Sequence, residues 1–181
     1  MASWSRIARR IRVPLGFGFA ALYVWLAHPT VASLIIGTLV ALPGLLLRAL
    51  ASGHVKKNEE LTVTGPYSYT RNPLYLGSLI LAIGFALASR NWIIAAVIVV
   101  LFFFIYLPVI RGEEAFLRQQ FPEFDNYASN VPRLFPRLTS YRKDSGSFSF
   151  DLYRKHREYN AALGATAVIA ILIAKLIFIS R

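Results

Sequence analysis

Two polar segments of this chain, residues 65–77 and 111–114, carry side chains that could bind charged ligands, and each adjoins a long apolar segment. The first offers arginine and tyrosine, which can bind anions, and the second offers two adjacent glutamates, which can bind cations. Charge, glycine and proline at the edge of a hydrocarbon layer are costly unless they serve a site or a turn. Two such segments, brought to one edge by a hairpin of spans, could share a binding cavity.

The first segment, GPYSYTRNPLYLG, combines turn chemistry with a possible anion site. Pro66 fixes its own φ and pushes Gly65 toward extended geometry. Asn72 and Pro73 predict an N-cap followed by proline at the first position of a membrane helix. Arg71 would stand beside three tyrosines at this helix N-terminus, where free N–H groups and the positive dipole end suit a carboxylate. A capped membrane helix entered by a turn would explain the same residues without any ligand.

The second segment continues an apolar span and puts a carboxylate on one face of a helix. Glu113 and Leu117 are four residues apart, so they share a face, and Glu114 adjoins it. A carboxylate on an otherwise apolar face lies at an interface or binds a cationic group. The alternative is that both glutamates are solvated below the membrane, or are paired with Arg111 or Arg118.

The composition favours a membrane protein over a soluble one. Hydrophobic residues make up 56% of the 181 residues and charged residues 16%, whereas soluble domains carry about 45–50% and about 25%. The absence of cysteine excludes disulfides, thiolate metal sites and a cysteine nucleophile, and no metal is expected. The net charge of +11 could serve nucleic acid, but no basic stripe interleaved with aromatic residues lies outside the apolar segments. Anionic lipid of the bilayer is therefore the expected partner of the positive charge.

Five apolar segments predict an all-α polytopic membrane bundle of about five transmembrane helices. Three of them approach the ~20 residues that are needed to cross ~30 Å of hydrocarbon, and two are shorter. Their predicted bounds are 13–27, 31–50, 74–88, 92–110 and 161–179. The short polar connectors 28–30 and 90–91 predict two helical hairpins.

The whole chain, 1–181, is expected to form one domain, with a core at 50–137 that carries both polar segments, and a C-terminal surface helix plus last span at 147–181. Seventeen of the 20 Lys and Arg residues fall before the first span, at the end of the second span or between it and the third, or between residues 111 and 160. The positive-inside tendency places these regions, and with them the N-terminus and the predicted cavity, on the cytoplasmic side.

The spacing of the two segments matches a known pattern. GPYxxxRxPxYxG, followed after two spans by EExxL, a tyrosine and VPRxxP, resembles the integral-membrane methyltransferases of the isoprenylcysteine carboxyl methyltransferase and phospholipid N-methyltransferase superfamily. The resemblance covers roughly residues 50–137. It implies S-adenosyl-L-methionine as the methyl donor, which leaves as S-adenosyl-L-homocysteine, and a lipophilic substrate that arrives from the bilayer.

Site residues follow from the resemblance by position. It implies that the cofactor is bound by His54, Glu60, Leu61, Tyr67, Asn72, Pro73, Leu74, Tyr75, Gly77 and Glu113. It implies that Arg71, Arg111 and Glu114 act in catalysis, the arginines by managing charge on the substrate.

The expected reaction is carboxyl methylation of an isoprenylcysteine-like or lipid carboxylate. The resembled family commonly has histidine where this chain has Asn72, and asparagine cannot act as a base. A carboxylate needs no base, whereas an ammonium headgroup must first lose a proton, with help from Glu114 or Tyr75. N-methylation of a phospholipid amine, S-methylation of a small thiol, a membrane reductase and a non-enzymatic membrane scaffold are the alternatives.

Overall fold

The computed structural model describes residues 2–56, 59–142 and 146–179, and every regular element in these ranges is helical. The helices are α1 (Ala2–Leu26), α2 (Val31–Ser52), α3 (Pro73–Ser89), α4 (Trp92–Leu101), α5 (Leu107–Gln120), α6 (Phe124–Asn130), α7 (Phe150–Lys155) and α8 (Tyr159–Ile179). A 3₁₀ turn, η1 (Gly65–Ser68), precedes α3, and a π-helical segment, η2 (Phe102–Tyr106), joins α4 to α5. The all-α prediction is confirmed for the described ranges.

Three helical segments are long and apolar enough to cross a membrane. They are Val31–Ser52, Trp92–Gln120 and Tyr159–Phe178, and they correspond to the three longer predicted spans. Pro14–Leu26 and Pro73–Ser89 are apolar but shorter. The membrane character of the chain therefore rests on three segments, and a count of five spans stays a prediction.

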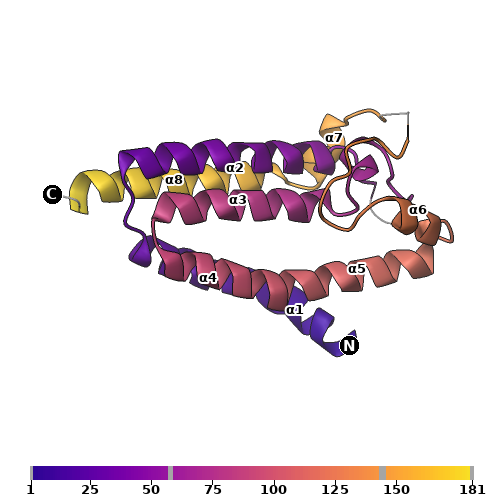
Figure 1. Cartoon of the computed structure of the whole chain (residues 1–181), viewed down its shortest axis with the longest axis horizontal. Coiled ribbons are helices and arrows are strands. Elements are labelled where there is room, and N and C mark those ends of the chain that lie inside the picture. Colours follow the sequence, from indigo (N-terminus) through magenta and orange to yellow (C-terminus); the bar gives the residue numbers. More distant parts are fainter. Residues whose placement is uncertain (1, 57–58, 143–145, 180–181) are drawn as a thin grey trace.

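The long helices run along the length of the molecule, and their connections gather at its two ends (Figure 1). α2 contacts both α3 and α8, while α1 contacts α5 and η2. The connectors 27–30 and 90–91 meet at one end, where His28 N–H donates to the Ser89 carbonyl at 2.8 Å and the Asn91 amide donates to the Leu26 carbonyl at 2.9 Å. The chain reverses direction at both predicted connectors. α3 contacts α4, which confirms the second predicted hairpin, whereas α1 makes most of its helix contacts with α5 and η2, so packing of α1 against α2 is not confirmed. The described parts of the segments 53–72 and 121–158, the latter with α6 and α7, lie together at the other end (Figure 1).

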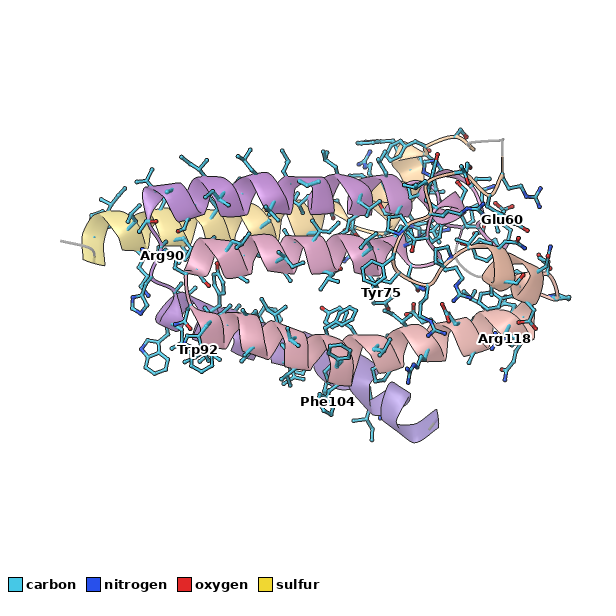
Figure 2. The ribbon with its side chains drawn as sticks, viewed as in Figure 1. Glu60, Tyr75, Arg90, Trp92, Phe104 and Arg118 are labelled. Carbon is cyan, nitrogen blue, oxygen red and sulfur yellow. The ribbon has the colours of Figure 1, made fainter. Side chains whose placement is uncertain are left out.

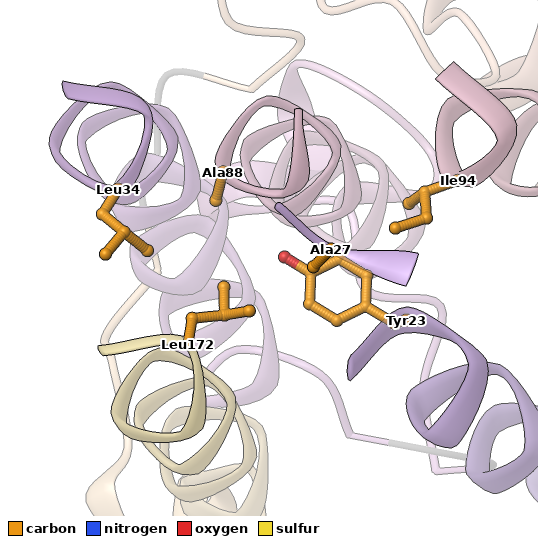
Figure 3. Packing of buried hydrophobic residues seen from close by; sticks show 6 residues of the cluster. All are labelled: Tyr23, Ala27, Leu34, Ala88, Ile94 and Leu172. Atoms are coloured by element: carbon orange, nitrogen blue, oxygen red, sulfur yellow. The ribbon is translucent and has the colours of Figure 1, made fainter. Parts of the chain in front are cut away.

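The largest buried apolar cluster sits at the connector end of the bundle, away from the polar segments. Its buried members come from five helices and the connector 27–30, and they are Tyr23, Ala27, Leu34, Ala88, Ile94 and Leu172 (Figure 3). The Tyr23 hydroxyl donates to the Phe85 carbonyl at 2.9 Å, which satisfies the one polar group of this cluster. Smaller buried clusters around Val109 and around Phe124 hold the other end of the bundle, where the polar segments lie.

Glycines let α2 and α3 approach with their backbones almost in contact. A Cβ on Gly37 would lie 2.5 Å from the Gly84 carbonyl oxygen, and one on Gly84 would lie 2.6 Å from that of Gly37. Closer to the polar end, a Cβ on Gly44 would lie 2.6 Å from the Gly77 carbonyl oxygen. Small residues at such crossings let membrane helices pack tightly, and here they set the position of α3 and its N-terminal residues.

The glycine contact gives a stability prediction. We expect Gly84→Ala to destabilise the protein by about 1–3 kcal/mol, because the added methyl overpacks a backbone contact that cannot yield locally. Gly164→Ala on α8 is the matched control, since nothing lies within 4 Å of its would-be Cβ. The thermal unfolding midpoint in detergent should fall for the first variant and hold or rise for the second. Equal midpoints would contradict the close α2–α3 crossing.

Candidate active site

A cavity of about 760 Å³ lies at the polar end of the bundle and brings the two polar segments together. This main cavity is lined from α2, the loop before η1, α3, η2, α5, α6 and the turn before α8. Ten of the thirteen predicted site residues line it, namely Glu60, Leu61, Tyr67, Arg71, Asn72, Pro73, Leu74, Tyr75, Glu113 and Glu114. Figure 2 shows Tyr75 on α3 pointing toward α5, with Glu60 at the same end of the molecule.

Three predicted residues lie outside the lining of the main cavity and have other contacts. The His54 ring nitrogen Nδ1 lies 2.8 Å from the Leu50 carbonyl, which holds the ring against the end of α2. Gly77 serves the α2–α3 crossing, where a Cβ would meet the Gly44 carbonyl oxygen at 2.7 Å. Arg111 is exposed. The predicted cofactor role of His54 and Gly77 and the predicted catalytic role of Arg111 therefore find no support in the geometry.

The turn η1 presents Tyr67 to the main cavity. Gly65 has φ +56°, so the extended geometry expected for it is wrong, and the left-handed conformation is open to glycine because it lacks a Cβ. The Tyr127 hydroxyl donates to the Tyr67 carbonyl at 2.6 Å and fixes the turn against α6. Burial raises the pKa of the Tyr67 phenol, so this side chain stays protonated. Its hydroxyl makes no hydrogen bond to the described residues and is available to a ligand.

Glu114 is the centre of a buried polar network. It is 5% exposed, and its Oε1 lies 3.3 Å from Arg71 Nε and accepts from Asn72 Nδ2 at 3.1 Å. Its Oε2 accepts from Arg133 Nε at 2.8 Å. Both carboxylate oxygens are therefore engaged, and the network ties α5 to the turn before α3 and to the segment after α6. This arrangement suits a positioning role better than that of a base.

The partners of Glu114 differ from those considered from the sequence. Arg118, which Figure 2 labels, pairs instead with Asp125 at 2.6 Å on the exposed surface. Asn72 does occupy the N-cap position of α3 and Pro73 does follow it, but the Asn72 side chain makes no capping bond. It turns to Glu114 and to the Arg133 carbonyl, to which it donates at 3.0 Å. Helix spacing predicted neighbours along α5, whereas the buried partners came from distant segments.

The segment 131–141 is held against the turn before α3 by backbone hydrogen bonds. Arg71 N–H donates to the Pro132 carbonyl at 3.0 Å, and Arg137 N–H donates to the Tyr69 carbonyl at 2.9 Å. The Thr70 hydroxyl donates to the Leu134 carbonyl at 3.0 Å. The VPRxxP segment, which the sequence left open between a surface segment and a plain loop, thus forms the outer support of the site.

Glu113 lines the main cavity, and no ion pair to a described side chain neutralises its charge. Its Oε1 accepts from the Tyr75 hydroxyl at 2.9 Å, and no cation whose side chain the structure describes lies at ion-pair distance from it. Among the described residues, the charged members of the lining are three cations and four carboxylates, namely Arg48, Lys56, Arg71, Glu60, Glu113, Glu114 and Glu158. The cavity is therefore suited to a ligand of net positive charge, with Glu113 as the carboxylate that can pair with it.

A smaller cavity of about 120 Å³ adjoins the main one in the apolar part of the bundle. This apolar cavity is lined by residues of α1, α3, α4 and η2, and Tyr75, Ser78 and Tyr106 line both cavities. Pro108 explains the π-helical segment that carries Tyr106, because proline lacks an N–H and its ring clashes with the carbonyl four residues before it. A molecule with a charged head and an apolar tail could span the junction.

Comparison with known proteins agrees with this geometry. Residues 15–123 match the family described as phospholipid methyltransferase, which covers more than half of the chain. The chain belongs to the phospholipid methyltransferase family. This result confirms the resemblance to the integral-membrane methyltransferase superfamily that the two polar segments indicated. No solved structure matches the chain.

Two curated relatives of this phospholipid methyltransferase family member carry names from metal resistance. The nickel-cobalt-cadmium resistance protein NccN of Alcaligenes xylosoxydans xylosoxydans is 36% identical over 135 residues, which cover 71% of this chain and 62% of the relative. The cobalt-zinc-cadmium resistance protein CzcN of Cupriavidus metallidurans is 41% identical over 90 residues, or 50% of this chain and 42% of the relative. The match thus spans less than two thirds of each relative.

Sequence reasoning missed several residues that line the main cavity of this methyltransferase family member. Arg48 was counted only as a positive charge beside a span, although an ionisable residue within an apolar segment is itself a signal for function. Tyr106 stands in a run of aromatic and apolar residues, and Glu158 follows a basic cluster, so neither gave a signal. Only their placement in space distinguishes them.

Proposed function

We propose that this protein is a membrane methyltransferase that uses S-adenosyl-L-methionine to methylate a lipophilic carboxylate. The observation that carries the proposal is the junction at which the main cavity, net-negative in its described lining, adjoins the apolar cavity through Tyr75, Ser78 and Tyr106. The main cavity suits a cationic methyl donor, and the apolar cavity suits the apolar tail of the acceptor. We assign the cavity end to the cytoplasmic side, because most Lys and Arg residues belong to the segments at that end.

The residues of the main cavity fit the proposed cofactor. The volume of about 760 Å³ lies within the range of roughly 300–1,000 Å³ that is usual for small-molecule sites. When bound, S-adenosylmethionine supplies a methyl group on a positively charged sulfonium. Glu113 would balance positive charge on the ligand, and Tyr67 would donate a hydrogen bond from its protonated phenol. Arg71, Asn72 and Glu114 would hold the wall in place through their buried network.

The polar network supports a carboxylate acceptor over an ammonium one. A carboxylate is already nucleophilic at neutral pH, whereas an ammonium group needs a base to remove a proton. Asn72 is not a base. Both carboxylate oxygens of Glu114 accept hydrogen bonds from the protein, and one of them also forms an ion pair with Arg71. A phospholipid amine is the second candidate, because the family description names phospholipid. Glu113 would then be the carboxylate left to accept the proton. The relatives' names describe metal resistance and do not say what is methylated.

Two measurements test the proposal on the full chain in detergent. Calorimetric titration with S-adenosylhomocysteine should give saturable binding, and no binding up to millimolar ligand would contradict the cofactor assignment. Radiolabelled methyl transfer into membrane lipids should then give a product that loses its label in mild base, as an ester does. A base-stable product would replace the carboxylate acceptor with an amine or thiol and keep the enzyme class.

A further inference from the structure

Arg48 is a charged residue that lines the main cavity beside the apolar cavity. It lies on the last turns of α2, in the candidate span Val31–Ser52. One terminal nitrogen of its guanidinium donates to the Ser78 hydroxyl and to the Leu74 carbonyl, the latter at 3.4 Å. Because Ser78 lines both cavities, these contacts place Arg48 at the junction where head and tail of an amphiphile would meet.

Glu158 neutralises Arg48 from the C-terminal part of the chain. Its Oε1 lies 2.6 Å from Arg48 Nε, and the two side chains are only 11% and 23% exposed. Arg157 adopts a left-handed backbone with φ +53°, which is costly for a residue with a Cβ and turns the chain between α7 and α8. His156 Nδ1 lies 3.0 Å from the Ser52 carbonyl and anchors that turn to the end of α2. Glu158 is thus held in place by local geometry.

Arg48 keeps hydrogen-bonding capacity toward the cavity. A guanidinium carries five N–H groups on three nitrogens. The contacts of Arg48 use Nε and one terminal nitrogen, while within the described ranges the other terminal nitrogen has no partner and is not fully buried. Guanidinium groups bind carboxylates and phosphates through paired N–H donors, so the open side of Arg48 is suited to an anionic group.

We propose that Arg48 is the acceptor-recognition residue, which selects an anionic headgroup attached to an apolar tail, and that Glu158 holds Arg48 in position and competes with the incoming anion. This inference rests on the proposed function and adds the specificity of its acceptor site. Glu158 lies beyond the family match at residues 15–123, so the C-terminal segment contributes to the cavity a residue that the matched part of the chain lacks. The donor side, around Glu113, is a separate wall of the same cavity.

The test compares acids with their uncharged amides. The ligands are a prenylated cysteine carboxylate and a long-chain fatty acid, and each is compared with its carboxamide. Their binding is measured in detergent for the wild type, Arg48→Gln and Glu158→Gln. We expect Arg48→Gln to weaken binding of both acids at least tenfold and to leave the amides unchanged. Glu158→Gln should tighten acid binding several-fold, because a neutral side chain competes less for Arg48. Glu59→Gln is the control, since the Glu59 side chain forms an exposed pair with Lys155 at 3.5 Å and does not belong to the described lining of the main cavity.

Affinity for S-adenosylhomocysteine separates this inference from the proposed function. It should stay within about twofold of the wild type in all three variants, and its loss in Arg48→Gln would assign Arg48 to the cofactor and overturn the inference. Wild-type protein that binds the cofactor product but does not prefer acids over amides would also overturn it, with the methyltransferase assignment intact. If Arg48→Gln fails to fold, Glu158→Gln still decides, because a gain in acid affinity cannot come from misfolding.

Discussion

Replacement of Glu113 by glutamine is expected to lower the affinity for S-adenosylmethionine by about 10–100-fold, which corresponds to the roughly 1.5–3 kcal/mol of a hydrogen bond to a charged group. The reason is that Glu113 is the lining carboxylate without a cationic partner among the described residues, so a positive ligand would supply the missing charge. Equilibrium binding of the labelled cofactor to purified protein in detergent measures the effect.

A comparison of two ligands sharpens the Glu113 experiment. S-adenosylhomocysteine lacks the sulfonium charge and keeps the amino group. A loss confined to S-adenosylmethionine would place Glu113 at the sulfonium, and an equal loss for both would place it at the amino group. Glu123→Gln is the control, because Glu123 is exposed at the same end of the molecule. Unchanged affinity for both ligands in Glu113→Gln would remove Glu113 from the cofactor site.

Replacement of Glu114 by alanine is expected to destabilise the protein by roughly 3–5 kcal/mol, as is usual when one member of a buried ion pair is removed. Arg71 would lose the carboxylate oxygen that lies 3.3 Å from its buried Nε, and the Asn72 amide would lose one of its acceptors. The thermal unfolding midpoint in detergent measures the loss. Asp125→Ala, which breaks the exposed pair with Arg118, should cost no more than about 1 kcal/mol.

The isosteric variant Glu114→Gln distinguishes a positioning residue from a catalytic one. If Glu114 positions the wall of the cavity, Glu114→Gln should lower the midpoint and weaken cofactor binding together with turnover. A variant that keeps the wild-type midpoint and cofactor affinity but loses turnover would restore the catalytic role that the resemblance implied.

Ten of the thirteen site residues predicted from the sequence line the main cavity, because the two polar segments sit at ends of spans that one hairpin brings together. Their roles stay predictions. Two of the three predicted residues outside the lining have a local reason for their position. His54 and Gly77 stand on either side of the site in sequence, but a helix end holds the former and a glycine crossing uses the latter. The position of a residue in a sequence motif does not predict which face of its helix packs against a neighbouring helix.

The sequence by itself determined the helical class, the two connectors at which the chain reverses direction, and the gathering of charge at one end, because hydrophobic blocks and turn residues act over short stretches of chain. Only the tertiary structure decided how the charges pair. Glu114 meets Arg71 and Arg133, and Arg48 meets Glu158 across 110 positions of sequence. Pairing of buried charges depends on distances between side chains of separate elements, and these distances are set by packing, which no local pattern encodes.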